Sequence, residues 1–179
     1  RRQRQMCIRD SNYNTPGEFR WSGQMTVPRE LHIKNGRLYQ LPVKELENYY
    51  ANTVNYKDVI VHEAMELEGV SGREIDMTID IQAGDYEEFR IQLAKNQKFY
   101  TEISYNAKKG ILTFDRNHAG SRRDFICQRS MKVESQDGKI RLRVVMDKYS
   151  VEIFANDGEK AMTSLIYTCL LYTSDAADE

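Results

Sequence analysis

Hydrophobic and polar residues alternate with a period of two over much of this chain. The run Arg73–Gln82 places Ile75, Met77, Ile79 and Ile81 on one face and polar side chains on the other. This alternation predicts a half-buried β-strand. Comparable patterns predict further strands at residues 88–93, 98–105, 110–114, 125–131, 139–146, 150–155 and 161–167.

Glycine, asparagine and aspartate separate these predicted strands, as expected for tight turns. The turn signals are Ala83-Gly84-Asp85, Asn106–Gly110, Gln136-Asp137-Gly138 and Asn156-Asp157-Gly158. Only Val43–Asn48 has a helical pattern, and only for a turn or two. Many short strands at this spacing favour an all-β sandwich or barrel.

The two ends of the chain are related at the level of DNA. A DNA string that encodes Arg2–Asp10 has a reverse complement that encodes Cys169–Ala177 in another frame. Residues 1–11 and 169–179 therefore resemble translated transposase-type sequencing adapters around a DNA insert. We expect them to be non-native and exclude them from fold reasoning. The alternative interpretation is a natural basic arm and acidic tail.

Composition narrows the classes of function. Leaving out the two ends removes four of the 26 basic residues and four of the 27 acidic residues, so the net charge stays at −1. This balance does not indicate a nucleic-acid partner. No apolar run approaches the roughly 20 residues of a membrane helix. Cys127 is then the one remaining cysteine, so the cysteine content indicates neither a disulfide framework nor a cellular compartment. We expect Cys127 to be a small buried hydrophobic residue.

Several motifs follow one another along the insert. Trp21–Leu31 fits W-x-G-x-x-x-x-P-R-E-L, and Asn35–Leu46 fits N-G-R-L-Y-Q-x-P-V-x-E-L. Phe114–Asn117 with Gly120 forms a third motif, and Val145–Glu159 contains Asp-x-x-Ser-Val-Glu-x-Phe and then Asn-Asp-Gly-Glu. In this order they resemble the C-terminal part of glycoside hydrolase family 32, whose members cleave fructose-containing sugars. Asn117-His118-Ala119 replaces a Ser-containing tripeptide of the family.

The resemblance implies an architecture. The family joins a five-bladed β-propeller, which carries the active site, to a C-terminal β-sandwich of two antiparallel sheets. By this analogy residues 12–35 are a remnant of the last propeller blade, residues 36–48 are a connector, and residues 49–168 are the sandwich.

The resemblance transfers no catalytic residue to this chain. Retaining glycosidases use a carboxylate nucleophile and a carboxyl acid/base. In the family these lie in the propeller, in Trp-Met-Asn-like and Glu-Cys segments, with a further Asp in an Arg-Asp-Pro segment. The insert contains none of the three. The parent protein is thus expected to be a retaining glycoside hydrolase, and this fragment is expected to be inactive alone. Asp147, Glu152, Asp157 and Glu159 are expected to be turn and surface groups. No cofactor is implied.

A few other side chains have alternative interpretations. Trp21 faces the sugar in the propeller mouth or, as we favour, staples the two domains together. Tyr49, Tyr50 and Tyr56 either pack over a sheet edge or form a sugar-stacking platform. His32, His62 and His118 lack metal-ligand spacing, so surface or capping roles are favoured. A basic loop either grips a sugar phosphate or an acidic patch or, as we favour, is a flexible solvated loop; its members are Arg116, His118, Arg122 and Arg123.

Two hypotheses for function remain. The first and favoured one is a structural domain of a β-fructosidase, which meets its fructose-containing saccharide through the missing propeller and can oligomerise through the sandwich. The second is a non-catalytic carbohydrate-binding module. The sandwich lacks long insertions, which favours a bacterial hydrolase of sucrose or sucrose 6-phosphate and a cytoplasmic rather than a secreted location. The sequence does not choose among sucrose, sucrose 6-phosphate, inulin and levan.

Overall fold

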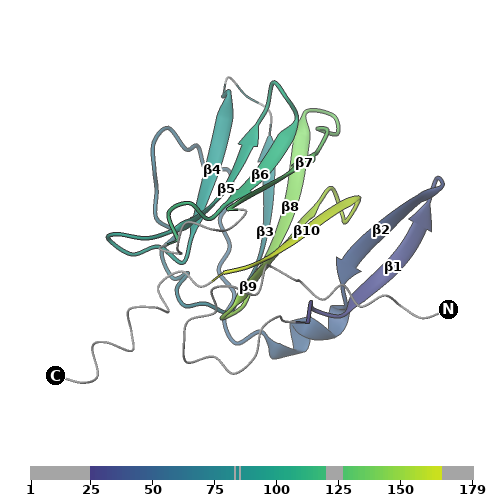
Figure 1. The fold of residues 1–179 in the computed structure, drawn as a ribbon, viewed down its shortest axis with the longest axis horizontal. Coiled ribbons are helices and arrows are strands. Elements are labelled where there is room, and N and C mark those ends of the chain that lie inside the picture. Colours follow the sequence, from purple (N-terminus) through teal and green to yellow (C-terminus); the bar gives the residue numbers. More distant parts are fainter. Residues whose placement is uncertain (1–24, 83, 85, 120–126, 167–179) are drawn as a thin grey trace.

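The computed structural model describes residues 25–82, 84, 86–119 and 127–166. These residues form two four-stranded antiparallel sheets and one two-stranded hairpin. The fold is therefore all-β and the predicted sandwich of two antiparallel sheets is confirmed (Figure 1). Residues 1–11 and 169–179, Trp21, Arg122 and Arg123 lie outside the described residues.

The first sheet has the strand order β10-β9-β8-β3. Its members are β3 (Ile75–Gln82), β8 (Lys139–Met146), β9 (Ser150–Ala155) and β10 (Lys160–Leu165). The second sheet has the order β4-β5-β6-β7. Its members are β4 (Glu88–Leu93), β5 (Thr101–Asn106), β6 (Ile111–Asp115) and β7 (Gln128–Lys132). These bounds agree closely with the strands that the alternation predicts.

The core lies between the two sheets. Each strand sends alternate side chains inward, so the register brings Leu142 of β8 opposite Ile79 of β3 and Ile103 of β5 opposite Phe114 of β6. Removing such apolar surface from water stabilises the fold by about 25 cal/mol per Å². The larger apolar side chains that are fully buried in this core are Ile103, Leu112, Phe114, Ile140, Leu142, Ile153 and Ile166, with Val133, Val144 and Val151.

The hairpin consists of β1 (Arg29–Lys34) and β2 (Arg37–Pro42), joined by Asn35-Gly36. Both turn residues have positive φ, 51° and 72°, as a two-residue turn with the twist of a hairpin requires. A short 3₁₀-helix, η1 (Lys44–Tyr49), follows β2. Residues 36–48, which the sequence predicts to be a connector, thus contain β2 and most of η1. The hairpin lies beside β10, with β2 nearer to the sandwich than β1 (Figure 1).

Candidate functional site at the junction of hairpin and sandwich

Strand β9 is buried on both faces. All six of its residues are buried, although successive side chains of a strand point to opposite sides. Val151 and Ile153 face the core, so Glu152 and Phe154 point outward, yet each is only 1% exposed. Residues of the hairpin segment provide the cover, which makes this outer face the best-defined interface in the described chain.

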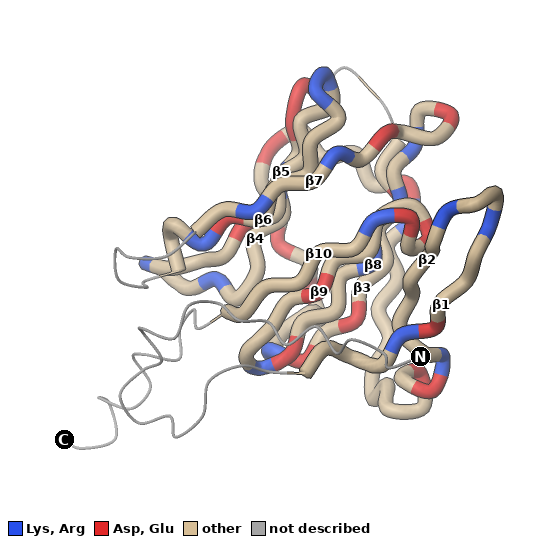
Figure 2. Tube along the Cα trace, turned by 45° about the vertical axis from the view of Figure 1, so that its right-hand side comes forward, with Lys and Arg blue, Asp and Glu red and all other residues tan. Residues whose placement is uncertain are grey.

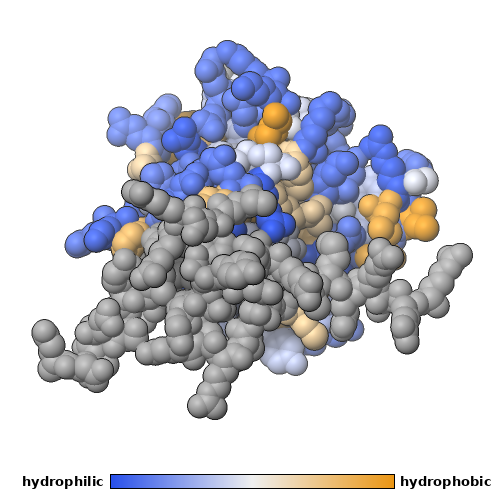
Figure 3. Space-filling view, viewed as in Figure 1, coloured by the Kyte–Doolittle hydropathy of each residue, from blue (hydrophilic) through white to orange (hydrophobic). Residues whose placement is uncertain are grey.

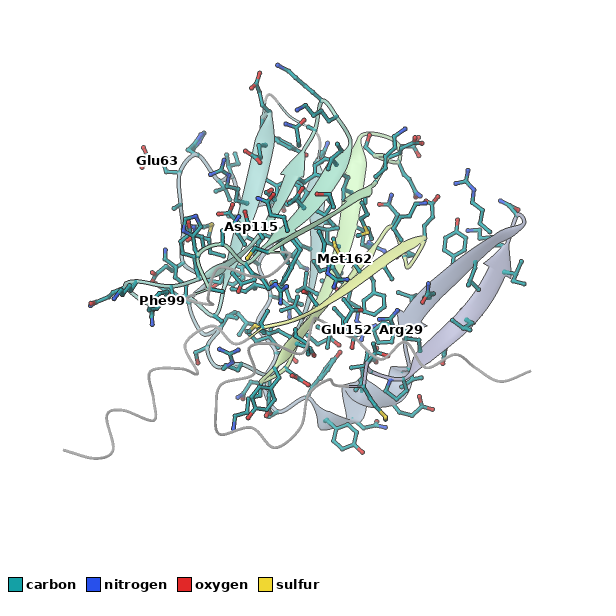
Figure 4. The ribbon with its side chains drawn as sticks, viewed as in Figure 1. Arg29, Glu63, Phe99, Asp115, Glu152 and Met162 are labelled. Atoms are coloured by element: carbon teal, nitrogen blue, oxygen red, sulfur yellow. The ribbon has the colours of Figure 1, made fainter. Side chains whose placement is uncertain are left out.

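An ion pair lies at the centre of this interface. Arg29 Nη2 lies 2.5 Å from Glu152 Oε2, and the two side chains are 10% and 2% exposed (Figure 4). The backbone N–H of Val27 donates to Glu152 Oε1 at 2.6 Å, so both carboxylate oxygens are satisfied. A buried carboxylate needs such hydrogen bonds to offset its lost hydration. Glu152 is therefore an internal anchor, and the expectation that it is a surface group is wrong.

The guanidinium of Arg29 has further partners. Its Nη2 donates to Thr163 Oγ1 at 2.7 Å, and its Nη1 donates to Gln40 Oε1 at 3.0 Å. Its central carbon lies 5.0 Å from the ring centroid of Phe154, within the range of a cation–π contact. One side chain thus connects β1, β2, β9 and β10.

A second contact joins β2 to the turn between β9 and β10. The backbone N–H of Gln40 donates to the carbonyl oxygen of Gly158 at 2.9 Å. Asn156, Asp157 and Gly158 all have positive φ, and a Cβ on Gly158 would lie 2.2 Å from the carbonyl oxygen of Gln40. Such a distance is impossible for a side chain, so this turn needs glycine both for its backbone conformation and for the close approach of β2.

A third contact fixes the chain after η1. Arg143 donates to both oxygens of Asp76, at 2.9 and 2.7 Å, and Tyr50 Oη donates to Asp76 Oδ2 at 2.5 Å. Burial, together with the bond to the Asp76 carboxylate, raises the pKa of Tyr50 above its usual value. The phenol therefore stays protonated near neutral pH and continues to donate.

The other residues singled out in the sequence do not converge on a common site. On the surface, His32 Nε2 lies 3.3 Å from Glu30 Oε2. The ring of His118 stacks on the ring of Tyr100, with 4.7 Å between their centroids. Cys127 is half-buried with a free thiol. Among the described residues, no group of three histidine, cysteine or acidic side chains is arranged to hold a metal ion.

The acidic residues near the C-terminal hairpin have structural partners. Asp147 Oδ1 accepts the backbone N–H groups of Tyr149 and Ser150, at 2.7 and 3.1 Å, and so caps the turn before β9. Asp157 Oδ1 lies 3.5 Å from Arg141 Nη1, and Glu159 Oε1 lies 2.5 Å from Arg37 Nη1. Asp147 and Asp157 thus have the expected turn positions.

The expected solvated basic loop is only partly correct. Arg116 is 8% exposed and its Nη1 donates to the carbonyl oxygen of Leu165 at 2.7 Å, so it is an internal tie to the end of β10. Elsewhere in the described part of the chain, basic and acidic positions are intermingled along the backbone trace (Figure 2). In the part of the chain that the structure describes, no helix is long and apolar enough to span a membrane.

The geometry defines a β-sandwich whose outer face holds a β-hairpin through a buried ion pair. Residues 45–177 match the family described as glycosyl hydrolases family 32, C terminal. The chain therefore belongs to glycoside hydrolase family 32 and carries its C-terminal domain.

Relatives with known names agree with this assignment. The chain is 32% identical over 165 residues to a sucrose-6-phosphate hydrolase of Staphylococcus xylosus, a match that covers 91% of the chain and 33% of that protein. It is 29% identical to a levanase of Bacillus subtilis, with 82% of the chain and 23% of the levanase covered. The chain thus spans about a third or less of the length of these curated relatives.

Solved structures share the fold. A sucrose-6-phosphate hydrolase from Lactobacillus gasseri superposes with a TM-score of 0.65 and 25% identity, over 83% of this chain and 30% of that one. An exo-inulinase from Aspergillus awamori superposes with a TM-score of 0.68 and 20% identity, over 86% of this chain and 32% of that one. The chain therefore carries the C-terminal domain found in β-fructosidases of differing specificity.

Proposed function

We propose that this chain is the structural C-terminal domain of a β-fructosidase, which hydrolyses terminal fructofuranosyl bonds in sucrose, sucrose 6-phosphate or fructans. The observation that carries the proposal is the contact between the hairpin and the outer face of β9. Arg29 and Glu152 bury an ion pair between the hairpin and the sandwich, while the outer half of the hairpin keeps Leu31 and Ile33 50% and 80% exposed. In this proposal β1 belongs to the remnant of the last blade of a five-bladed propeller at residues 12–35, β2 belongs to the connector at residues 36–48, and the sandwich supports the propeller.

The carboxylates of the chain support a structural role. A retaining glycosidase needs two carboxyl groups about 5–5.5 Å apart, facing the scissile bond. Three acidic groups of the Val145–Glu159 motif have structural roles: Glu152 binds Arg29, Asp147 caps a turn, and Glu159 binds Arg37. In this proposal the propeller of the whole protein supplies the catalytic pair and contacts the fructose-containing saccharide.

A chimera tests this function. The propeller of the Staphylococcus xylosus sucrose-6-phosphate hydrolase, ended before the last-blade segment that residues 12–35 supply and joined in frame to residue 12 of this chain, should fold and cleave sucrose 6-phosphate. It should also melt at a higher temperature than the propeller alone, because the sandwich buries apolar surface against it. The purified 179-residue chain should cleave neither sucrose nor inulin. Cleavage by the chain alone, or a chimera no more stable than the propeller, contradicts the proposal.

One observation favours the alternative of a carbohydrate-binding module. The ring of Tyr49 is 84% exposed, as a sugar-stacking residue would be. Its neighbour Tyr50 is engaged with Asp76 and does not extend the platform. Calorimetric titration of the chain with inulin and levan, and of a Tyr49→Ala variant, separates the two functions. Binding that the variant loses would support the module.

A further inference from the structure

Residues 57–67, between η1 and β3, form a loop whose two ends are held together. The hydroxyl of Tyr56 donates to the carbonyl oxygen of Glu68 at 2.7 Å, which closes the loop at its base. Every residue of the loop is exposed. Glu63, near the middle of the loop, lies at the periphery of the fold (Figure 4). The loop therefore presents its middle to solvent, as compact surface loops with close ends do.

The middle of this loop is apolar, which is unusual for so exposed a segment. Val59, Ile60 and Val61 follow one another along the chain and are 46%, 78% and 61% exposed. By contrast, the described surface on the face shown in Figure 3 is mostly hydrophilic. Contiguous apolar surface left in water commonly marks a site of association.

The backbone of this apolar run is available for pairing. Among the described residues, neither a backbone hydrogen bond nor a strand pairing involves residues 57–63. Valine and isoleucine favour extended structure, and the heptapeptide contains neither proline nor glycine. An exposed segment of this kind is a template for pairing with another strand. It lies inside the continuous range 25–82, so described residues flank it on both sides.

We propose that two copies of this chain pair through residues 57–63, as antiparallel strands about a twofold axis at Ile60. In this register Val59 is opposite the partner's Val61, and the two copies of Ile60 face each other. The contact is isologous, because the same segment serves on both sides. It removes three aliphatic side chains of each copy from water, which provides the driving force.

Charge selects this register. The sequence KDVIVHE matches itself when it is reversed: Lys57 is opposite the partner's Glu63, and Asp58 is opposite the partner's His62. Each pair forms twice about the axis, and opposite charges directly across a ladder are favourable. A neutral imidazole still donates one ring N–H, so His62 can bind the carboxylate in either charge state.

The contact is small and requires one local change. Asp58 has a φ of 52° in the single chain, so pairing over the full register requires this residue to become extended. A short ladder of two strands buries little surface, and the dimer should therefore dissociate on dilution. This contact gives the expected association through residues 49–168 a defined place, and it does not rest on the proposed function.

Charge exchange in the predicted register tests the proposal. Sedimentation velocity of the wild-type 179-residue chain should show a monomer–dimer equilibrium that depends on concentration. Glu63→Lys places two positive charges opposite each other at both ends of the ladder and should raise the dissociation constant about tenfold. Adding Lys57→Glu restores opposite charges with exchanged signs and should return the constant to near the wild-type value.

Glu66→Lys is the matched control, because it makes the same charge change in the same exposed loop but outside the register. It should leave the dissociation constant unchanged. Ile60→Lys brings two positive charges together on the axis and should abolish dimerisation over the measured concentrations. Circular dichroism checks that each variant is folded, which we expect because all of the substituted positions are exposed.

Several results would overturn the proposal. One is a wild-type chain that is monomeric at every concentration. Others are equal dissociation constants for Glu63→Lys and Glu66→Lys, or a double variant that remains as weak as Glu63→Lys. Dimers that persist in Ile60→Lys would place the association on another surface. Protection of the Ile60 amide from hydrogen exchange in the monomer would show that the segment already pairs within its own chain.

Discussion

Gln40 and Gly158 approach each other so closely that no side chain fits between them. The N–H of Gln40 donates to the Gly158 carbonyl at 2.9 Å, and a Cβ on Gly158 would meet the carbonyl oxygen of Gln40 at 2.2 Å. The turn between β9 and β10 and the strand β2 are therefore fitted to one another as backbone against backbone. Any residue other than glycine must separate them.

Replacing Gly158 with alanine should undock the hairpin. The variant combines a positive φ of 88° with the clash against Gln40, so we expect a loss of about 3 kcal/mol in the free energy of unfolding. Urea unfolding measures this loss, and faster trypsin cleavage after Lys34 reports the undocking. Gly36→Ala is the matched control: its φ is 72° but nothing lies within 4 Å of the added Cβ, so it should cost only about 1 kcal/mol. Equal losses would contradict the fit described here.

Removing the carboxylate of Glu152 should destabilise the junction more than removing an exposed charge. Glu152→Ala leaves the Arg29 guanidinium buried without its counter-ion, which costs about 3–5 kcal/mol. Arg37→Ala breaks a pair whose arginine is 70% exposed and should cost less than about 1 kcal/mol.

A paired substitution separates charge from packing at the same place. Replacing both Arg29 and Glu152 by methionine removes the two charges together, so it should recover most of the stability that Glu152→Ala loses. Thermal unfolding of the wild type and the variants checks the order. A double variant as unstable as Glu152→Ala would show that geometry and not charge pairing dominates.

Stability should depend on pH through Asp80. The Arg141 guanidinium donates to both Asp80 oxygens, at 2.6 and 2.8 Å, and these hydrogen bonds lower the pKa of Asp80. A depressed folded-state pKa means that the carboxylate contributes stability above its unfolded pKa of about 4, and that this stability is lost as the pH falls through the folded pKa.

Comparison of Asp80→Asn with the wild type isolates this contribution. The variant should be less stable at pH 7, by less than about 1 kcal/mol because the Asp80 side chain is 59% exposed. The difference should shrink as the pH falls below about 4. Urea unfolding at several pH values measures it. A difference that grows in acid would contradict the assigned direction.

Truncating a core side chain should cost more than any change on the surface. Leu142 is fully buried on the inner face of β8, and Leu142→Ala should lower the unfolding free energy by about 2–5 kcal/mol. Ile60 is 78% exposed, so Ile60→Ala should change it by less than about 0.5 kcal/mol. Differential scanning calorimetry distinguishes the two, and similar shifts would contradict the assigned core.

The sandwich could be predicted from the sequence because its strands alternate over short distances. The patterns at residues 139–146 and 150–155 coincide with β8 and β9, and the pattern at 88–93 coincides with β4. Asn156-Asp157-Gly158 also lies in the turn that its composition predicts. These features depend on neighbouring residues, which a single sequence displays directly.

The junction could not be predicted in the same way. The polar position of Glu152 within β9 looks like the solvated face of a half-buried strand, and its cover comes from Arg29, 123 residues earlier. Arg116 was similarly expected in a solvated loop, although its guanidinium bonds to the carbonyl of Leu165. Contacts between distant segments leave no periodic signal. The local hints are the P-R-E-L and Val-Glu-x-Phe motifs, which contain the two partners.

The burial of β9 on both faces sets a limit on where this domain can be cut. The match to the family begins at residue 45, whereas Arg29, Gln40 and the N–H of Val27 that cover β9 come before it. A polypeptide starting at residue 45 would keep both sheets but leave Glu152 and Phe154 in water. The interface that buries the outer face of β9 therefore extends further toward the N-terminus than the segment that the family comparison recognises.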